Sequence, residues 1–181
     1  SLHDALPICL YSLSRGIVAV SREIHHADAY AISRKEVPSP TKKKKSGVPD
    51  CNAKNVALSL TPAASSLGVG GSMDFTTDIK YDGSSKVGCL VDISASNVVL
   101  TIKSGDDVIW KSNVCPVDAD YRLLAKGDKV KQTITWPGTR TGSECVEEST
   151  LPKVDRGVYS AQLSIEGHPK AKSDPVGITV E

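Results

Sequence analysis

The five cysteines are the residues of this chain whose chemistry is most informative. Cys9 stands near the start, and the other four are Cys51, Cys89, Cys115 and Cys145. None of them forms a C-x-x-C pair, so a zinc site built from closely spaced thiolates is not indicated. Four well-separated cysteines in a small domain are typical of two disulfides, which form in oxidising compartments. The alternative is a set of buried free thiols in a cytosolic protein.

The turn chemistry between the cysteines favours one of the three possible pairings. If Gly105-Asp106 forms a two-residue hairpin turn, Cys115 lies opposite Ser96. The strand that contains Cys89 reaches the same end of the sheet, which brings the two thiols together, and elimination leaves the second pair. The predicted disulfides are therefore Cys89–Cys115 and Cys51–Cys145.

The remaining polar residues do not indicate a catalytic site. Nucleophilic catalysis needs a nucleophile, a base and an orienting group within reach of one another. From Cys51 onward the chain has a single histidine, His168, in a segment that reads as an exposed turn. No G-x-S-x-G elbow, S-x-x-K motif or phosphate-binding glycine loop stands out in the same region. We therefore expect no enzyme, no catalytic residue and no cofactor.

A metal site is not expected either. Asp118 and Asp120 have the spacing of carboxylates in a calcium-binding loop, but the rest of an EF-hand frame is missing. His25-His26 has no second pair at a ligand spacing. The acidic pairs Asp106-Asp107 and Glu147-Glu148 lie in predicted loops, where solvated side chains are the simpler interpretation.

From Cys51 onward, apolar and polar side chains alternate as they do in half-buried strands. The alternating runs are residues 56–60, 73–81, 98–102, 108–110, 130–136, 159–165 and 176–180. Glycine-containing turn signals separate them, and no segment of this region shows a helical stripe. Seven or eight short strands without intervening helices predict an all-β antiparallel sandwich or barrel.

Trp110 and Trp136 both lie within predicted strands. The chain has one Phe, so the two tryptophans and the tyrosines must supply most of the aromatic bulk of a core. Core packing is therefore the favoured role of both side chains. The alternative is an exposed aromatic anchor for a partner or a glycan.

The first 50 residues differ in composition from the rest. They carry eight Lys/Arg and five Asp/Glu, against 14 and 16 in residues 51–181. Residues 1–8 match the translation of a common sequencing adapter, so we expect an adapter-derived artefact followed by a fragment without its natural N-terminus. Residues 9–50 have the composition of a poorly ordered head with a Pro/Lys linker, which should add nothing to the core of a domain spanning 51–181.

Charge and hydropathy exclude some partners. The formal net charge of +1 provides no field that would recruit nucleic acid. The lysine run at residues 42–45 lacks interleaved aromatic residues, which favours a solvated spacer over a nucleic-acid patch. No stretch of this fragment approaches the ~20 apolar residues of a membrane helix, although an upstream anchor is expected.

A recurring order of motifs gives a resemblance to known families across residues 51–181. The motifs are Cys89, Ser104-Gly105-Asp106, Ile109-Trp110-Lys111-Ser112, Cys115, Thr133-Ile134-Thr135-Trp136-Pro137-Gly138, Cys145 and Gly157-Val158-Tyr159-Ser160-Ala161. This order resembles uncharacterised envelope proteins of Gram-positive actinobacteria with an immunoglobulin-like domain. More distantly, the T-x-T-W-x-G and G-x-Y-x-A elements look like the bacterial intracellular proteinase inhibitor domain, whose members lack this cysteine framework. The resemblance implies an immunoglobulin-like fold and an extracytoplasmic, membrane-anchored location.

Two functions follow as expectations. The first is a non-catalytic, extracytoplasmic module of the bacterial cell envelope, structural or protein-binding, with an unknown protein or envelope partner. The alternative is a proteinase inhibitor that presents an exposed loop, for which residues 137–156 are the best candidate because Cys145 tethers them.

Overall fold

Residues 47–181 are the part of the chain that the computed structural model describes, and strands make up nearly all of their regular structure. The strands are β1 (Val56–Pro62), β2 (Ser66–Leu67), β3 (Met73–Tyr81), β4 (Cys89–Asp92), β5 (Val98–Ser104), β6 (Asp107–Lys111), β7 (Tyr121–Leu124), β8 (Lys129–Trp136), β9 (Gly157–Ile165), β10 (His168–Lys172) and β11 (Val176–Val180). Within this range the helical structure is limited to one 3-10 turn, η1 (Glu148–Thr150), and no helix there is long and apolar enough to span a membrane. The predicted all-β class is confirmed.

The first sheet contains β1, β3 and β8 in that order, with antiparallel neighbours. β3 lies at its centre, and its sequence explains why. Every second side chain of β3 is buried, namely Met73, Phe75, Thr77, Ile79 and Tyr81. The residues between them are polar and face outward, so one face of the sheet is apolar and the other meets solvent.

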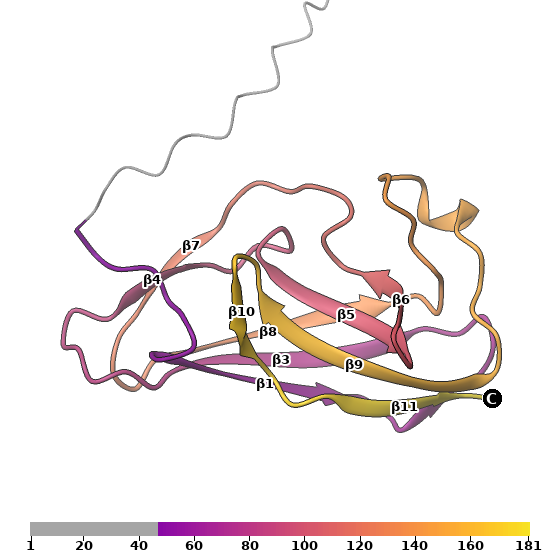
Figure 1. The fold of residues 1–181 in the computed structure, drawn as a ribbon, viewed down its shortest axis with the longest axis horizontal. Coiled ribbons are helices and arrows are strands. Elements are labelled where there is room, and N and C mark those ends of the chain that lie inside the picture. The colour runs from indigo at the N-terminus through magenta and orange to yellow at the C-terminus, as the bar shows by residue number, and fades with distance from the viewer. Residues whose placement is uncertain (1–46) are drawn as a thin grey trace, which may run out of the picture. The chain divides into compact units, whose positions relative to one another are not determined.

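The second sheet has the order β2-β11-β9-β5-β6, with β10 paired to the end of β9. Its neighbouring strands are antiparallel except β2 and β11, which are parallel. The consecutive strands β1 and β2 belong to different sheets. With β1, β3 and β8 in one sheet and β5, β9 and β11 in the other, the strand order follows that of immunoglobulin domains. The domain is an immunoglobulin-like β-sandwich (Figure 1).

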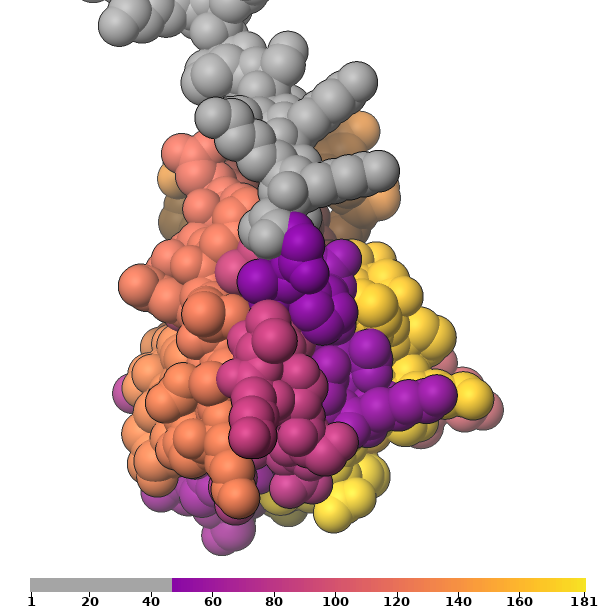
Figure 2. Space-filling model, turned by 90° about the vertical axis from the view of Figure 1, so that its left-hand side faces the viewer, coloured from indigo at the N-terminus to yellow at the C-terminus, as the bar shows by residue number. Residues whose placement is uncertain are grey.

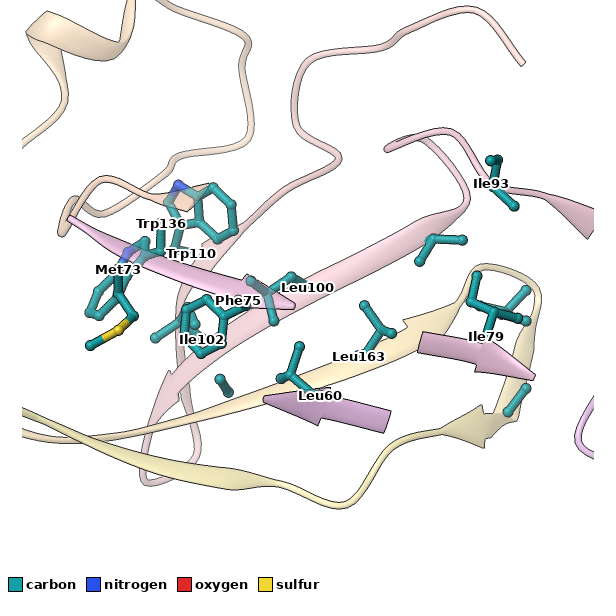
Figure 3. Packing of buried hydrophobic residues seen from close by; sticks show 14 of the residues in the cluster. Leu60, Met73, Phe75, Ile79, Ile93, Leu100, Ile102, Trp110, Trp136 and Leu163 are labelled. Atoms are coloured by element: carbon teal, nitrogen blue, oxygen red, sulfur yellow. The ribbon is translucent and has the colours of Figure 1, made fainter. Parts of the chain in front are cut away.

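The core lies between the two sheets (Figure 3). Phe75 and Trp136 of the first sheet and Leu100, Ile102 and Leu163 of the second all have 0% exposure. Trp110 of β6 is 8% exposed and belongs to the same cluster. Both tryptophans are core residues, as the sequence predicted.

The hairpin between β5 and β6 has the predicted two-residue turn at Gly105-Asp106. Gly105 has a φ of 58°, which suits the first central position of a type II′ turn and is strained for other residues. Beyond the turn, Ile109 forms a bulge that shifts the register by one residue. Trp110 therefore pairs with Ile102 and shares its inward face.

Three short strands were not predicted: β2, β7 and β10. β7 pairs only with β4, and the two form a ribbon separate from both sheets. β10 begins at His168, which the sequence placed in an exposed turn; the turn contains only Glu166-Gly167, and His168 is half-buried. β2 has only two residues, and β7 and β10 each have a single buried residue, so none of the three shows an alternation of apolar side chains.

The ordered contacts of the domain begin before the predicted boundary at Cys51. Asp50 forms a parallel bridge with Leu90, and the Leu90 amide donates to the Pro49 carbonyl at 2.8 Å. Figure 2 shows this end of the domain, where the indigo start of the described chain lies beside the magenta segment that contains β4. Pro49 and Asp50 therefore pair with β4, although both are exposed and neither belongs to the core cluster. The adapter segment, the rest of the head through residue 46 and the lysine run lie outside the described residues.

A tyrosine fixes the corner where the chain enters β9. The Tyr159 hydroxyl donates a 2.7 Å hydrogen bond to the carbonyl of Asp155, four residues upstream. Its ring lies 5.6 Å from that of Trp136, centroid to centroid. This is the tyrosine corner of immunoglobulin-like sandwiches. Burial, reinforced by the charge of Asp155, raises the pKa of the Tyr159 phenol.

We expect Tyr159→Phe to lower the free energy of unfolding at pH 7 by about 1 kcal/mol, because it removes one hydrogen bond. A raised folded-state pKa keeps the native phenol protonated while the unfolded phenol ionises near pH ~10, so wild-type stability falls above that pH. The Phe variant lacks this contribution, and the stability gap should therefore shrink as the pH rises from 8 to 11. Urea denaturation across that range measures it, and a constant or widening gap would contradict the prediction.

Candidate functional site

The two disulfides of the domain are Cys51–Cys89 and Cys115–Cys145. All four predicted cysteines are oxidised in pairs, but the predicted pairing, Cys89–Cys115 with Cys51–Cys145, is wrong. The two observed disulfides join cysteines that are 38 and 30 residues apart. Both separations are shorter than that of the predicted Cys51–Cys145 pair.

The error arose from extending the β5–β6 hairpin too far. The bulge at Ile109 shifts the register, and β6 ends at Lys111. The side chain of Ser96 instead bonds to the backbone of Val117, accepting from its amide at 3.0 Å and donating to its carbonyl at 3.1 Å. Cys89 lies in the β4–β7 ribbon rather than in an extension of the β5 sheet. No strand register therefore connects it with Cys115.

The disulfide Cys51–Cys89 is buried, with 2% and 0% exposure of its two residues. The Cys51 amide donates to the carbonyl of Leu90 at 2.9 Å, so backbone pairing and the disulfide join the same two segments. This bridge fastens the start of the domain to β4, and its role is structural.

The disulfide Cys115–Cys145 is exposed at both residues and links two loops. Loop 112–120 leads from β6 to β7, and loop 137–156 leads from β8 to β9. Figure 1 shows loop 137–156, with η1 within it, projecting from the sandwich near β6. We call residues 112–120 and 141–152 together the loop pair.

Backbone hydrogen bonds close the base of loop 137–156. Thr139 and Lys153 form an antiparallel bridge, and the Val154 amide donates to the Gly138 carbonyl at 3.0 Å. The buried indole N–H of Trp136 donates to the Thr139 carbonyl at 3.0 Å. Gly138 has a φ of 62°, and a Cβ there would collide with the carbonyl oxygen of Gly71. The loop therefore starts from a rigid, glycine-dependent turn.

The loop then covers the open edge of β6. The Thr141 amide donates to the Ile109 carbonyl at 3.0 Å, and the Thr141 hydroxyl accepts from the Lys111 amide at 3.1 Å. Arg140 pairs with Asp107 at 2.8 Å. The hydrogen bond to Asp107 raises the pKa of Arg140. These contacts, together with the disulfide, hold the loop on the sheet.

A hollow of about 170 Å³ lies between the two loops, above Trp110. The residues that line it include apolar Trp110, Val114, Val146 and Leu151, and the acidic Glu144 and Glu148. The exposed disulfide borders it through Cys115. A second, more open hollow of about 440 Å³ lies beside β10 and is lined by residues 52–54 and 167–171.

Every charged residue of the loop pair is acidic. The loop pair contains Asp118, Asp120, Glu144, Glu147 and Glu148, and no lysine or arginine. Asp120 is paired with Arg122, just outside the loop pair, at 3.0 Å. The sequence predicted solvated side chains for Glu147-Glu148, gave Asp118 and Asp120 only the spacing of a calcium-binding loop, and did not single out Glu144. Glu144 and Glu148 both line the hollow, whereas the Asp120 amide donates to the carboxylate of Asp92 at 2.9 Å, beside the β4–β7 ribbon.

The other residues considered from the sequence do not come together. Within residues 47–181, no three His, Cys, Asp or Glu side chains are placed to hold a metal ion. His168 lies in β10, and Asp106-Asp107 is at the β5–β6 turn. The hollow was not predicted, although loop 137–156, which forms one wall of it, was the loop singled out by sequence.

Comparison with known proteins supplies no family. No protein-family model matches the chain, and no curated protein sequence matches it. A β-glucosidase from Erythrobacter marinus is similar at 12% identity and a TM-score of 0.43, over 70% of this chain and 16% of that one. A CARDB domain from Pyrococcus furiosus is similar at 9% identity and a TM-score of 0.40, over 70% of this chain and 94% of that domain. For the sporulation control protein of Bacillus subtilis the values are 13% and 0.41, over 70% of this chain and 49% of that one.

These likenesses are too weak to carry an argument about function. The chain spans about a sixth of the β-glucosidase that it matches. An activity that belongs to the whole glycosidase is therefore not transferred to this domain.

The two disulfides should differ in what they stabilise. In the chain-entropy model a closed loop of 30 to 38 residues contributes about 4 kcal/mol. We expect the double variant Cys115→Ala/Cys145→Ala to lose about 2–4 kcal/mol and to loosen only the loop pair. Cys51→Ala/Cys89→Ala should lose more, because it also leaves a cavity in the core.

Guanidinium denaturation and amide hydrogen exchange under non-reducing conditions measure both effects. Non-reducing peptide mapping of the wild type provides the control for the pairing. A larger loss for the exposed bridge, or core amides that exchange faster than the measured loss of global stability explains, would contradict the assignment.

Proposed function

We propose that this chain is a non-catalytic, extracytoplasmic module of the bacterial cell envelope that binds a protein partner through the loop pair. The observation that supports it is the exposed Cys115–Cys145 disulfide, which joins two loops beside an apolar hollow that is also lined by Glu144 and Glu148. Loops on a rigid β-sandwich are where immunoglobulin-like domains place their binding residues.

The compartment follows from the cysteines. An exposed disulfide meets the glutathione and thioredoxin systems in a reducing cytoplasm, so its persistence requires an oxidising environment. The resemblance of the motif order to that of envelope proteins of Gram-positive actinobacteria favours the envelope as that environment. Membrane anchoring upstream of the domain is part of the same proposal.

An inhibitor of proteinases is the second candidate, because loop 137–156 is tethered at its base and by Cys145. A substrate-like inhibitor loop enters the protease cleft as an extended segment with its side chains exposed. Here Glu148–Thr150 form a 3-10 turn, and Val146 and Leu151 line the hollow. Loop 137–156 therefore forms one wall of a hollow and is not an extended segment that could enter a protease cleft. This arrangement favours the binding module over the inhibitor.

The location is tested by acid-quenching cells that produce the protein and alkylating free thiols before any reduction. We expect Cys51, Cys89, Cys115 and Cys145 to remain unmodified until a reductant is added. Cytoplasmic production of the same chain is the control, in which at least the exposed pair should react. Free Cys115 and Cys145 in the natural location would overturn the proposal.

The two candidate functions are separated by a protease panel. At equimolar concentration, the oxidised protein should leave trypsin, chymotrypsin, elastase and subtilisin fully active. A stoichiometric loss of activity that disappears when residues 143–150 are replaced by a glycine-serine segment would establish the inhibitor instead.

A further inference from the structure

We propose that the hollow between the loops binds the side chain of a lysine or arginine in a basic segment of the protein partner. This inference rests on the proposed function and names the chemistry of its partner. The long side chains of these residues combine an aliphatic stem with a cationic head. The hollow offers a complementary surface for each of the two parts.

The apolar side of the hollow suits the stem. Trp110 forms part of it, and Val114, Val146 and Leu151 contribute from the two loops. Val146 is 47% exposed, so part of this apolar surface is accessible to a partner. Burying such surface against methylene groups is favourable.

The polar side of the hollow suits the cationic head. Glu144 and Glu148 both line it, and neither belongs to an ion pair in the described part of the chain. Lys111 also borders the hollow and is likewise without an ion pair among those residues, so the lining keeps an excess of one negative charge. Two carboxylates against one ammonium group in an otherwise apolar lining therefore favour a cation over a neutral or anionic side chain.

The surrounding residues extend this preference to a basic segment. Glu147 adds a further negative charge next to Glu148, while the flanking Arg122 and Arg140 are already paired with Asp120 and Asp107 and Lys153 donates to the Pro137 carbonyl. A field of one sign steers oppositely charged partners and rejects those of like charge. The Cys115–Cys145 bridge holds the two walls in place before binding, which limits the ordering cost.

The test uses the full oxidised chain and defined peptides of sequence Ac-Gly-Leu-Xaa-Leu-Gly-amide. Xaa is arginine, lysine, norleucine or glutamate, so norleucine keeps the stem and removes the charge. Titrations followed by the amide signals of Val114, Thr141 and Val146 give the Kd of each peptide. We expect the arginine and lysine peptides to bind about 3- to 10-fold more tightly than norleucine, and glutamate not to bind.

Three Glu→Gln variants test whether the preference for cationic peptides arises at the hollow. Glu144→Gln and Glu148→Gln should each weaken arginine-peptide binding by about 2- to 5-fold. Glu147→Gln is the matched control, because it removes the same charge from a neighbouring residue that does not line the hollow; it should change the Kd by less than about 1.5-fold. Raising the salt concentration from 0.05 to 0.5 M in the wild type should weaken only the cationic peptides.

Several outcomes would overturn the inference. Equal binding of norleucine and arginine would show a purely apolar site. Equal effects of the three glutamine variants would show general acidic attraction without a specific hollow, and the absence of arginine-peptide shifts would show no site. None of these results alters the oxidation state of the cysteines in cells, so failure here is distinguishable from failure of the proposed location.

Discussion

The indole of Trp136 is the contact on which the rest of this domain depends. It is fully buried at the end of β8, and it packs against Tyr159, the corner residue that opens β9. Its N–H donates to the carbonyl of Thr139, in the turn where loop 137–156 begins. One side chain therefore joins the core, the corner of the second sheet and the base of the site. A shift of this ring would move all three, because a close-packed interior transmits displacements rather than absorbing them.

The two disulfides have different roles: one stabilises the domain, and the other fixes the positions of two loops. Cys51–Cys89 lies inside the domain and secures its first residues and β4 to the sandwich. Cys115–Cys145 lies outside the core, where it holds two loops that have few apolar contacts of their own. A loop of polar residues cannot offset its conformational entropy by burial, so a covalent link is an effective way to order it. The hollow above Trp110 depends on this second bridge.

The proposed binding function relies on a separation between scaffold and site. Hydrogen bonds to β6 and the closed base of loop 137–156 place the loop pair on a rigid edge. The acidic residues of the loop pair are exposed and make almost no ion pairs within residues 47–181, apart from Asp120 with Arg122. Charges that the fold does not use are available to a partner. This arrangement is the physical basis of the proposed recognition of a basic side chain.

The sequence by itself determined the strands whose apolar residues alternate over several positions, such as Met73–Tyr81, and the glycine-dependent turn at Gly105-Asp106. It also determined the core role of the tryptophans and the oxidation of four cysteines, because side-chain period and composition are local properties. Only the tertiary structure decided which cysteines pair, since one bulged residue at Ile109 and an unpredicted ribbon of β4 and β7 changed which segments meet. The hollow could not be predicted from the sequence either. Val114 and Glu148 are 34 positions apart in the chain, and their proximity arises from chain folding and a covalent bridge rather than from any local pattern.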